Sequence, residues 1–306
     1  MRIGAVNYLN SKPLVYGLEQ LAPESQVRFD LPSRLADSLA SERLDVALIP
    51  TVELFRSPGY SIVSDACVAC HGRVLSVKLH FRVPPAIVRT VALDEGSRTS
   101  AALTQILLAE LHGVSPKWEP LPIGRGLDAT AADAVLLIGD RAITSREQEA
   151  RRGEWRAESS EQGAGSGEQK QMRREHTGSP LQAQRSTCDV WDLGEVWRDW
   201  TGLPFVFAMW TARPGVETNE IAPVLVAARD NGVRHLDEIA AAAASELEIS
   251  VELATSYLRD NLHFSLGPAE RDGLSRFYRL CLKHGLVPGQ DNESFFEQHR
   301  EHDCIY

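Results

Sequence analysis

The chain lacks a long hydrophobic run and an excess of basic residues. No apolar segment approaches the roughly 20 residues that a membrane-spanning helix needs. The start, Met1 to Gly4, leads into polar residues where a signal peptide would have its apolar core, so we expect a cytoplasmic protein. The formal net charge is -10 over 306 residues, and no block of Lys or Arg lies on a predicted element, which argues against nucleic-acid and membrane partners.

The chain also lacks a disulfide framework, because its cysteines are odd in number and widely scattered. They are Cys67, Cys70, Cys188, Cys281 and Cys304. Residues Cys67 to His71 match the C-x-x-C-H pattern of covalent haem attachment, but the missing export signal and the flanking strand-like runs favour two small buried thiols. No second C-x-x-C or H-x-x-x-H lies nearby to complete a zinc site, so the sequence predicts no metal centre.

A helix followed by a short apolar strand occurs once in each half of the chain. Residues 34–40 have helical apolar spacing and lead into a short strand at 45–50. Residues 126–131 lead in the same way into the apolar run at 133–140. Continuous apolar strands of this kind are buried on both faces, as in sheets that helices cover on either side. The pattern predicts an α/β protein with two lobes and a cleft between them.

Two polar turns follow predicted strands and mark a candidate binding site. The first turn, residues 7–13, follows the strand at 2–6, and a polar turn at the carboxyl end of a strand is where open α/β proteins bind small ligands. The second, residues 95–100, follows the strand at 90–94 and opens a helix. Its free backbone N–H groups favour a carboxylate or phosphate, although Ser97 or Thr99 can equally be a simple helix cap.

Residues 144–188 contain almost no large apolar residues and cannot build a core, so we expect a disordered or weakly helical surface insertion there. After it, residues 203–213 have the composition of a long apolar strand. The remainder is predicted to be helical, at about 219–231, 236–244, 251–261 and 268–284, with breaks at Gly232 and Gly285.

Six segments, in order along the chain, resemble the chorismate dehydratase family of the futalosine route to menaquinone. They are AVNYLNSKPLVYGL from Ala5, DVALIPTVEL from Asp45, SDACVACHGRVLSV from Ser64, DEGSRTSAAL from Asp94, AVLLIGDRAI from Ala134 and DLGEVWRDWTGLPFVFAMWTARP from Asp192. The resemblance implies a fold like the type II periplasmic solute-binding proteins. Lobe I would hold residues 1–86 and 205–306, and lobe II residues 87–204.

The activity that the resemblance implies is the loss of water from chorismate, which gives 3-[(1-carboxyvinyl)oxy]benzoate without a cofactor. By similarity, Asn10 and Ser76 lie against the reacting part of the substrate and are the predicted catalytic residues. The predicted substrate-binding residues are Ser11, Thr51, Ser97, Arg98, Thr99, Ser100 and Asp140.

Neither Asn10 nor Ser76 is a strong base, and the matched segments hold no Ser-His-Asp arrangement. The hypothesis that fits is substrate-assisted elimination, in which the enolpyruvyl carboxylate of chorismate takes the C3 proton. Asp140 and His71 are competing bases: Asp140 ends a strand, and His71 stands where similar segments of the family have another residue.

Three other functions remain open at this point. The same fold can serve as a non-catalytic cytosolic protein that binds a small anion. The 1,4-dihydroxy-6-naphthoate synthase of the same route resembles this fold but differs from AVNYLNSKPL in its early motifs. A cytochrome is the third possibility, from the C-x-x-C-H pattern alone.

Overall fold

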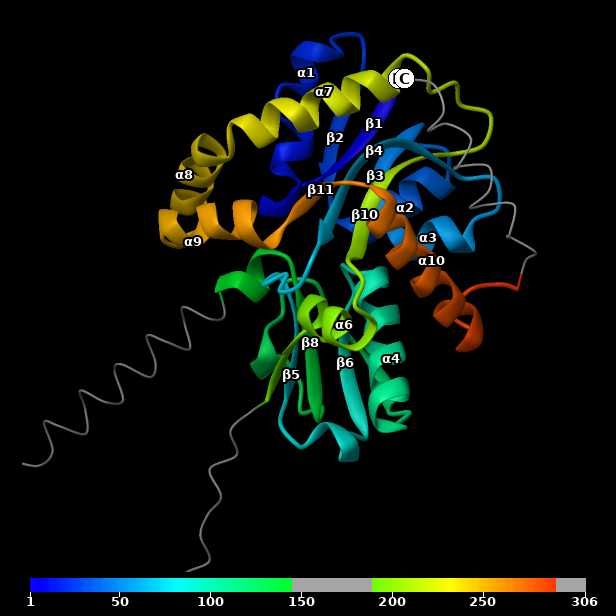
Figure 1. Cartoon of the computed structure of the whole chain (residues 1–306), viewed down its shortest axis with the longest axis vertical. Helices are drawn as coiled ribbons and strands as arrows, with labels where there is room; N and C mark the ends of the chain where they lie inside the picture. Colours follow the sequence, from blue (N-terminus) through cyan, green and yellow to red (C-terminus); the bar gives the residue numbers. More distant parts are fainter. Residues whose placement is uncertain (145–188, 290–306) are drawn as a thin grey trace, which may run out of the picture.

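The computed structural model describes residues 1–144 and 189–289. The expected insertion therefore lies, apart from Thr144, outside the described residues, as do Cys188 and Cys304. The described chain forms two β-sheets, each with its own helices (Figure 1). This confirms the predicted α/β class.

The first sheet has six strands in the order β11-β4-β10-β3-β1-β2. The strands are β1 (Arg2–Val6), β2 (Gln26–Asp30), β3 (Val46–Pro50), β4 (Ser61–Cys70), β10 (Phe205–Ala212) and β11 (His263–Ser265). Strands β2 and β3 run parallel to β1, while β10 runs antiparallel to both β3 and β4. Every residue of β3 is buried, as its continuous apolar sequence predicts.

Helices cover both faces of the first sheet. They are the 3-10 helix η1 (Leu9–Val15), α1 (Leu18–Leu21), α2 (Pro32–Ala40), α3 (Thr51–Arg56), α7 (Ile221–Arg234), α8 (Leu236–Leu247), α9 (Val251–Ser256), the π-helical turn η4 (Tyr257–Asn261) and α10 (Pro268–Lys283). Helix α7 packs on η1 and β4, whereas α2, α3 and α10 lie on the opposite side of the sheet (Figure 1).

The second sheet has five strands in the order β7-β6-β8-β5-β9. The strands are β5 (Val77–Phe81), β6 (Thr90–Asp94), β7 (Lys117–Leu121), β8 (Ala134–Ile138) and β9 (Val190–Asp192). The helices of this part include η2 (Pro85–Ile87), α4 (Arg98–His112), η3 (Leu127–Ala129) and α6 (Leu193–Thr201), and residues 140–144 are also helical. The helix expected at 126–131 is only the short 3-10 turn η3, since this segment has few apolar residues to bury.

The chain passes between the two sheets twice, once after β4 and once before β10 (Figure 1). We expected the first crossing near residue 86, but β5 already pairs with β8 and β9 of the second sheet. The crossing is earlier because all five residues of β5 are buried in that sheet. We therefore propose lobe boundaries that follow the sheets: residues 1–70 and 205–289 in lobe I, and residues 77–144 and 189–201 in lobe II.

The predicted C-terminal helices are present as α7 to α10, but Gly232 does not break a helix. It lies inside α7, and a Cβ atom at this position would lie 2.0 Å from the carbonyl oxygen of Pro13. Glycine here permits close contact between α7 and η1. Gly285, which follows α10 with φ at 65°, does end its helix as expected.

The haem-like motif lies within the first sheet. Cys67 and Cys70 belong to β4, and their side chains are 0% and 1% exposed. Both are free thiols, and burial raises the pKa of each. The expectation of two small buried thiols is confirmed.

Candidate functional site

A cavity lies between the two sheets, lined by residues of both lobes. Its polar wall consists of Tyr8, Asn10, Ser76, Ser97 and Ser100. The apolar wall comes from both lobes, with Leu48, Val68 and Phe207 on one side and Val77 and Ile138 on the other. A mostly apolar lining with a few convergent polar groups is typical of sites for small organic molecules.

Asn10 reaches the cavity from the polar turn that follows β1. Two hydrogen bonds shape this turn: the Ser11 hydroxyl donates to the carbonyl oxygens of Val6 at 2.9 Å and Tyr8 at 3.0 Å. A third fixes it to the second lobe, because the Leu9 amide donates to the Asp140 carboxylate at 3.0 Å. These bonds hold the backbone at Asn10 in place. The Asn10 side chain takes part in none of them.

Ser76 lies in the crossing segment between β4 and β5, at a turn held by Asp192. The Asp192 carboxylate accepts hydrogen bonds from the backbone N–H groups of Val74 at 2.9 Å and Leu75 at 2.7 Å. Leu75 has φ at 59°, a left-handed conformation that non-glycine residues rarely adopt. The same carboxylate caps α6 through Gly194. Asp192 therefore fixes the backbone segment from which the Ser76 side chain projects into the cavity.

Tyr257 lies behind Asn10 and Ser76 and was not predicted from the sequence. It is fully buried, and burial raises the pKa of its phenol, while the neighbouring Ser76 and Asn10 side chains oppose that rise. Within the described residues, neither the Tyr257 hydroxyl nor the Ser76 hydroxyl has a hydrogen-bond partner. Buried hydroxyls without partners are uncommon in folded proteins, so Ser76, which lines the cavity, is a candidate for contact with a ligand.

The start of α4 forms another part of the wall. Ser97 is the N-cap of α4: its side chain accepts from the Ser100 amide at 3.2 Å, and its hydroxyl donates to the Ser100 hydroxyl at 2.7 Å. The sequence left open whether this turn caps the helix or binds a ligand. Ser97 does the first and is placed for the second, because it caps α4 and also lines the cavity. The helix N-terminus adds a partial positive charge on this side.

Tyr8 brings lobe I against the end of β8 in lobe II. A Cβ atom on Gly139, where φ is 65°, would lie 2.9 Å from the Tyr8 ring, so only glycine permits this contact. Burial raises the pKa of Tyr8 to about 12, and the nearby Asp94 carboxylate adds to the rise. Tyr8 therefore remains protonated and can donate a hydrogen bond into the cavity. The sequence contained its signal, since Tyr8 belongs to the polar turn that was expected to bind ligand.

Three of the predicted binding residues use their hydroxyls within the protein and do not line the cavity. They are Ser11, Thr51 and Thr99. The Thr51 hydroxyl donates to the Val206 carbonyl oxygen at 2.9 Å, and the Thr99 hydroxyl accepts from the Val52 amide at 3.2 Å. Because Thr99 is on α4 and Val52 on α3, this bond joins the two lobes beside the cavity.

Arg98 and Asp140 also lie outside the cavity lining. The Arg98 guanidinium forms ion pairs with Asp37 at 2.6 Å and Glu53 at 3.2 Å, both in lobe I. Asp140 accepts from Leu9, as described above, and burial raises the pKa of its carboxyl to about 6. The structure thus brings Asn10, Ser76, Ser97 and Ser100 together, while the other predicted residues support the surrounding backbone or the contact between lobes.

We expect the Asp140→Asn variant to change how stability depends on pH. The folded-state pKa of Asp140 is above the ordinary value of 3.8. Its contribution to the free energy of unfolding is therefore complete below about pH 4 and is lost as the pH rises through about 6. Asparagine keeps the acceptor for Leu9 but does not titrate. We compare the free energy of unfolding in urea at about pH 4.5 and at about pH 7.5. Between these two values the variant should become more stable relative to wild type by about 1–3 kcal/mol. If variant and wild type differ in free energy of unfolding by the same amount at both pH values, the raised pKa of Asp140 is contradicted.

The fold and the cavity define a class: a two-lobed α/β protein of the periplasmic binding protein type. A solved structure from Archaeoglobus fulgidus matches it with a TM-score of 0.68 and 13% identity, covering 94% of this chain and 98% of that one. A Candida albicans gene product described as having the generic periplasmic binding protein fold matches with a TM-score of 0.58 and 13% identity, covering 95% and 92%. Every helix among the described residues is too short or too polar to cross a membrane.

The chain belongs to the menaquinone biosynthesis family, whose family model matches residues 1–154 and 179–283. Among curated proteins, the chorismate dehydratase of Thermus thermophilus is 32% identical over 278 residues, which cover 90% of this chain and 93% of that protein. These findings confirm the family resemblance of the six sequence segments.

Proposed function

We propose that the chain is a chorismate dehydratase, a carbon–oxygen lyase that converts chorismate to 3-[(1-carboxyvinyl)oxy]benzoate and water. Membership of the menaquinone biosynthesis family and the Thermus thermophilus relative support this activity. The observation that carries the proposal is the composition of the cavity wall, whose polar groups among the described residues are all uncharged hydroxyls or amides. Such a wall can orient a dianionic substrate through neutral donors.

The reaction asks little of the protein beyond orientation and one proton transfer. A proton leaves C3 of the substrate, hydroxide leaves C4, and the ring becomes aromatic. Aromaticity supplies the driving force, so correct placement of the substrate can lower the barrier without a strong protein base. Neutral donors in an apolar cavity are suited to this task because they interact strongly with the substrate carboxylates away from bulk water.

We assign one carboxylate to the start of α4, where Ser97 and Ser100 provide hydroxyls beside the free N–H groups of the helix. Asn10 and Ser76 would hold the enolpyruvyl carboxylate near C3. That carboxylate takes the C3 proton, the C4–O bond breaks with its electron pair going to oxygen, and the proton then leaves with this hydroxide as water. Asp140, the competing base expected from the sequence, does not line the cavity, and its carboxylate accepts from the Leu9 amide.

The proposal requires only a small-molecule substrate. It involves no cofactor, nucleic acid or membrane, and it assigns the reaction to the cytoplasm. Ser11, Thr51, Arg98, Thr99 and Asp140 would contribute indirectly, by holding the turn after β1 and the contact between α3 and α4.

The direct test is to mix the purified full-length protein with chorismate and to follow the products by ultraviolet absorbance and mass spectrometry. We expect loss of one water and formation of the enolpyruvyl benzoate. Binding of chorismate without turnover would instead indicate the non-catalytic anion-binding protein. A folded protein that neither binds nor converts chorismate would direct attention to the 1,4-dihydroxy-6-naphthoate synthase reaction.

The Tyr257→Phe variant tests whether the buried phenol helps to orient Asn10 and Ser76. Phenylalanine keeps the ring, and loss of an unpaired buried hydroxyl should leave stability unchanged or raise it by up to about 1 kcal/mol. If the phenol positions Asn10 and Ser76, kcat should fall about tenfold with little change in KM. Urea unfolding and steady-state kinetics separate the two effects, and an unchanged kcat would assign Tyr257 to packing alone.

A further inference from the structure

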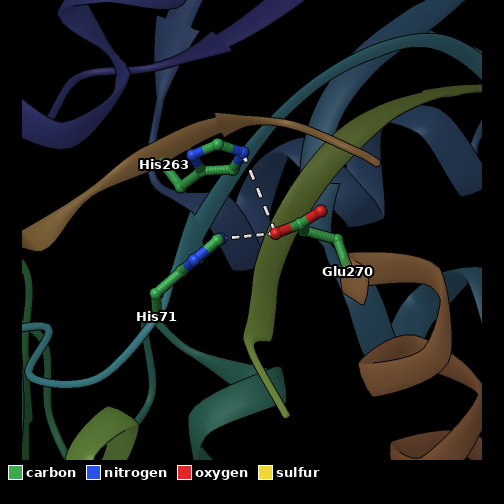
Figure 2. Close-up of side chains that lie close together, drawn as sticks. All are labelled: His71, His263 and Glu270. Carbon is green, nitrogen blue, oxygen red and sulfur yellow. Dashed lines mark hydrogen bonds and ion pairs between the residues drawn. The ribbon is translucent and has the colours of Figure 1, made fainter. Parts of the chain in front are cut away.

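Three side chains outside the cavity converge beside the point where the chain leaves β4. His71 directly follows β4, His263 belongs to β11, and Glu270 lies in the first turn of α10. All three point toward one another although they come from separate elements (Figure 2). Their candidate ligand atoms lie within 4.8 Å of one another, and none of the three side chains lines the cavity.

Glu270 is the centre of this group. Its side chain is only 4% exposed, and one carboxylate oxygen, Oε2, accepts from the Gly267 amide at 3.0 Å, which caps α10 and orients the carboxylate. The other oxygen, Oε1, lies 2.5 Å from His71 Nε2 and 3.8 Å from His263 Nε2 (Figure 2). A backbone hydrogen bond that orients a carboxylate in this way is typical of ligands in metal sites.

The two imidazoles are close to the separation that a shared ion requires. Their ring centroids lie 4.5 Å apart. In a tetrahedral zinc site with bonds of about 2.0–2.1 Å, ligand atoms are roughly 3.3 Å from one another. Changes of up to about 1.5 Å in these separations, including an opening of the 2.5 Å contact between His71 and Glu270, would bring the three ligand atoms to this spacing. His71 can make such a shift, because its side chain is 53% exposed and lies in a turn.

We propose that His71, His263 and Glu270 form a binding site for a divalent first-row transition ion, with Zn²⁺ as the representative ion. Two imidazole nitrogens and one carboxylate oxygen are a donor set that suits such ions, and three protein ligands leave a position for water. Mg²⁺ and Ca²⁺ prefer oxygen ligands and should not compete.

The site would join three separate segments at the lobe boundary. The same turn is already tied to the chain before β11, because the Asn261 side-chain amide donates to the Arg73 carbonyl oxygen at 3.0 Å. A bound ion would strengthen this connection and would stabilise the folded protein by mass action, since the unfolded chain does not hold the ligands together. The ion would lie apart from the cavity and would take no part in the elimination.

The experiment uses the full-length, tag-free protein after removal of metal with a chelator and exchange into chelator-free buffer. Zn²⁺ is titrated by calorimetry, and the melting temperature is measured with and without the ion. We expect one equivalent of Zn²⁺ to bind and to raise the melting temperature, and we expect no such shift with Mg²⁺. Co²⁺ should bind at the same site and give a visible absorption band.

Three variants locate the ion. His71→Ala and His263→Ala should each weaken Zn²⁺ binding by more than about 10-fold. Glu270→Gln should weaken Zn²⁺ binding in the same way. Because glutamine keeps an acceptor for the Gly267 amide, weaker binding by this variant cannot be attributed to loss of the helix cap. His235→Ala is the matched control, because His235 is an exposed histidine that stacks on Tyr16 elsewhere in lobe I.

Two outcomes would overturn the proposal. If the wild-type protein does not bind Zn²⁺, the His71–Glu270 contact is only a hydrogen-bonded pair. If Zn²⁺ binds equally to wild type, His71→Ala and His263→Ala, the ion occupies another part of the chain. Circular dichroism of each variant confirms that the comparison is made between folded proteins.

Discussion

Replacing Asn10 with alanine is expected to lower kcat for chorismate dehydration by about 100-fold. The Asn10 amide lies on the cavity wall and is held there by the bonded turn after β1, so its removal takes away a donor without disturbing that turn. Ser76→Ala should have an effect of similar size, because this hydroxyl is 1% exposed and has no hydrogen-bond partner among the described residues. Single-turnover kinetics would show whether the loss lies in chemistry or in binding.

Asn7→Ala is the matched control for Asn10→Ala. Asn7 belongs to the same polar turn but is exposed and does not line the cavity, so its replacement should leave kcat within about twofold of wild type. Full turnover by a folded Asn10→Ala variant would remove Asn10 from the mechanism. The assignment of the proton to the substrate carboxylate would then lose its main support.

The Asp192→Ala variant is expected to lose both stability and activity. This buried carboxylate accepts from Val74 and Leu75 on one side and from Gly194 and Glu195 at the start of α6. Its removal leaves buried N–H groups without partners and should cost about 3 kcal/mol or more in urea unfolding. The turn that carries Ser76 would also relax, and a displacement of about 1 Å at a reacting group can reduce turnover about 100-fold.

Asp192→Asn separates these two effects. The amide oxygen can still accept from Val74, Gly194 and Glu195 in place of Oδ1, but the NH₂ group would face the Leu75 N–H in place of Oδ2. We therefore expect α6 to remain intact, with a smaller loss of stability and a clear loss of kcat. If the asparagine variant retains wild-type kcat, the Leu75 contact does not position Ser76.

The closed arrangement of the lobes comes from contacts between residues that are far apart in the chain. Leu9 and Asp140, Val52 and Thr99, and the Arg98 ion pairs all join lobe I to lobe II around the cavity. Several of these residues are ones that the sequence assigned to the substrate. Hydroxyl and charged groups at strand ends and helix starts suit both roles, and spacing along the chain does not distinguish them.

Much of the fold could be predicted from the sequence because its signals are local. Strands β3 and β8 have continuous apolar sequences and are buried along their whole length. Ser97 caps α4 as its position before the helix predicts, and the C-terminal helices occur where their apolar periodicity places them. Asn10, Ser76, Ser97 and Ser100 were chosen from polar turns and family resemblance, and all four line the cavity.

The tertiary structure alone decided which polar groups meet. Nothing in the sequence near Asn10 indicates Tyr257, and nothing near Ser76 indicates Asp192, because hydrogen bonds and burial at these places depend on packing between distant segments. The same is true of His71, His263 and Glu270, which have no metal-ligand spacing in the chain and converge only when β11 pairs with β4 and α10 packs beside them. The sequence by itself determined the elements and their buried faces, since these depend on short-range periodicity. The partners of each polar side chain were determined by the three-dimensional arrangement of those elements.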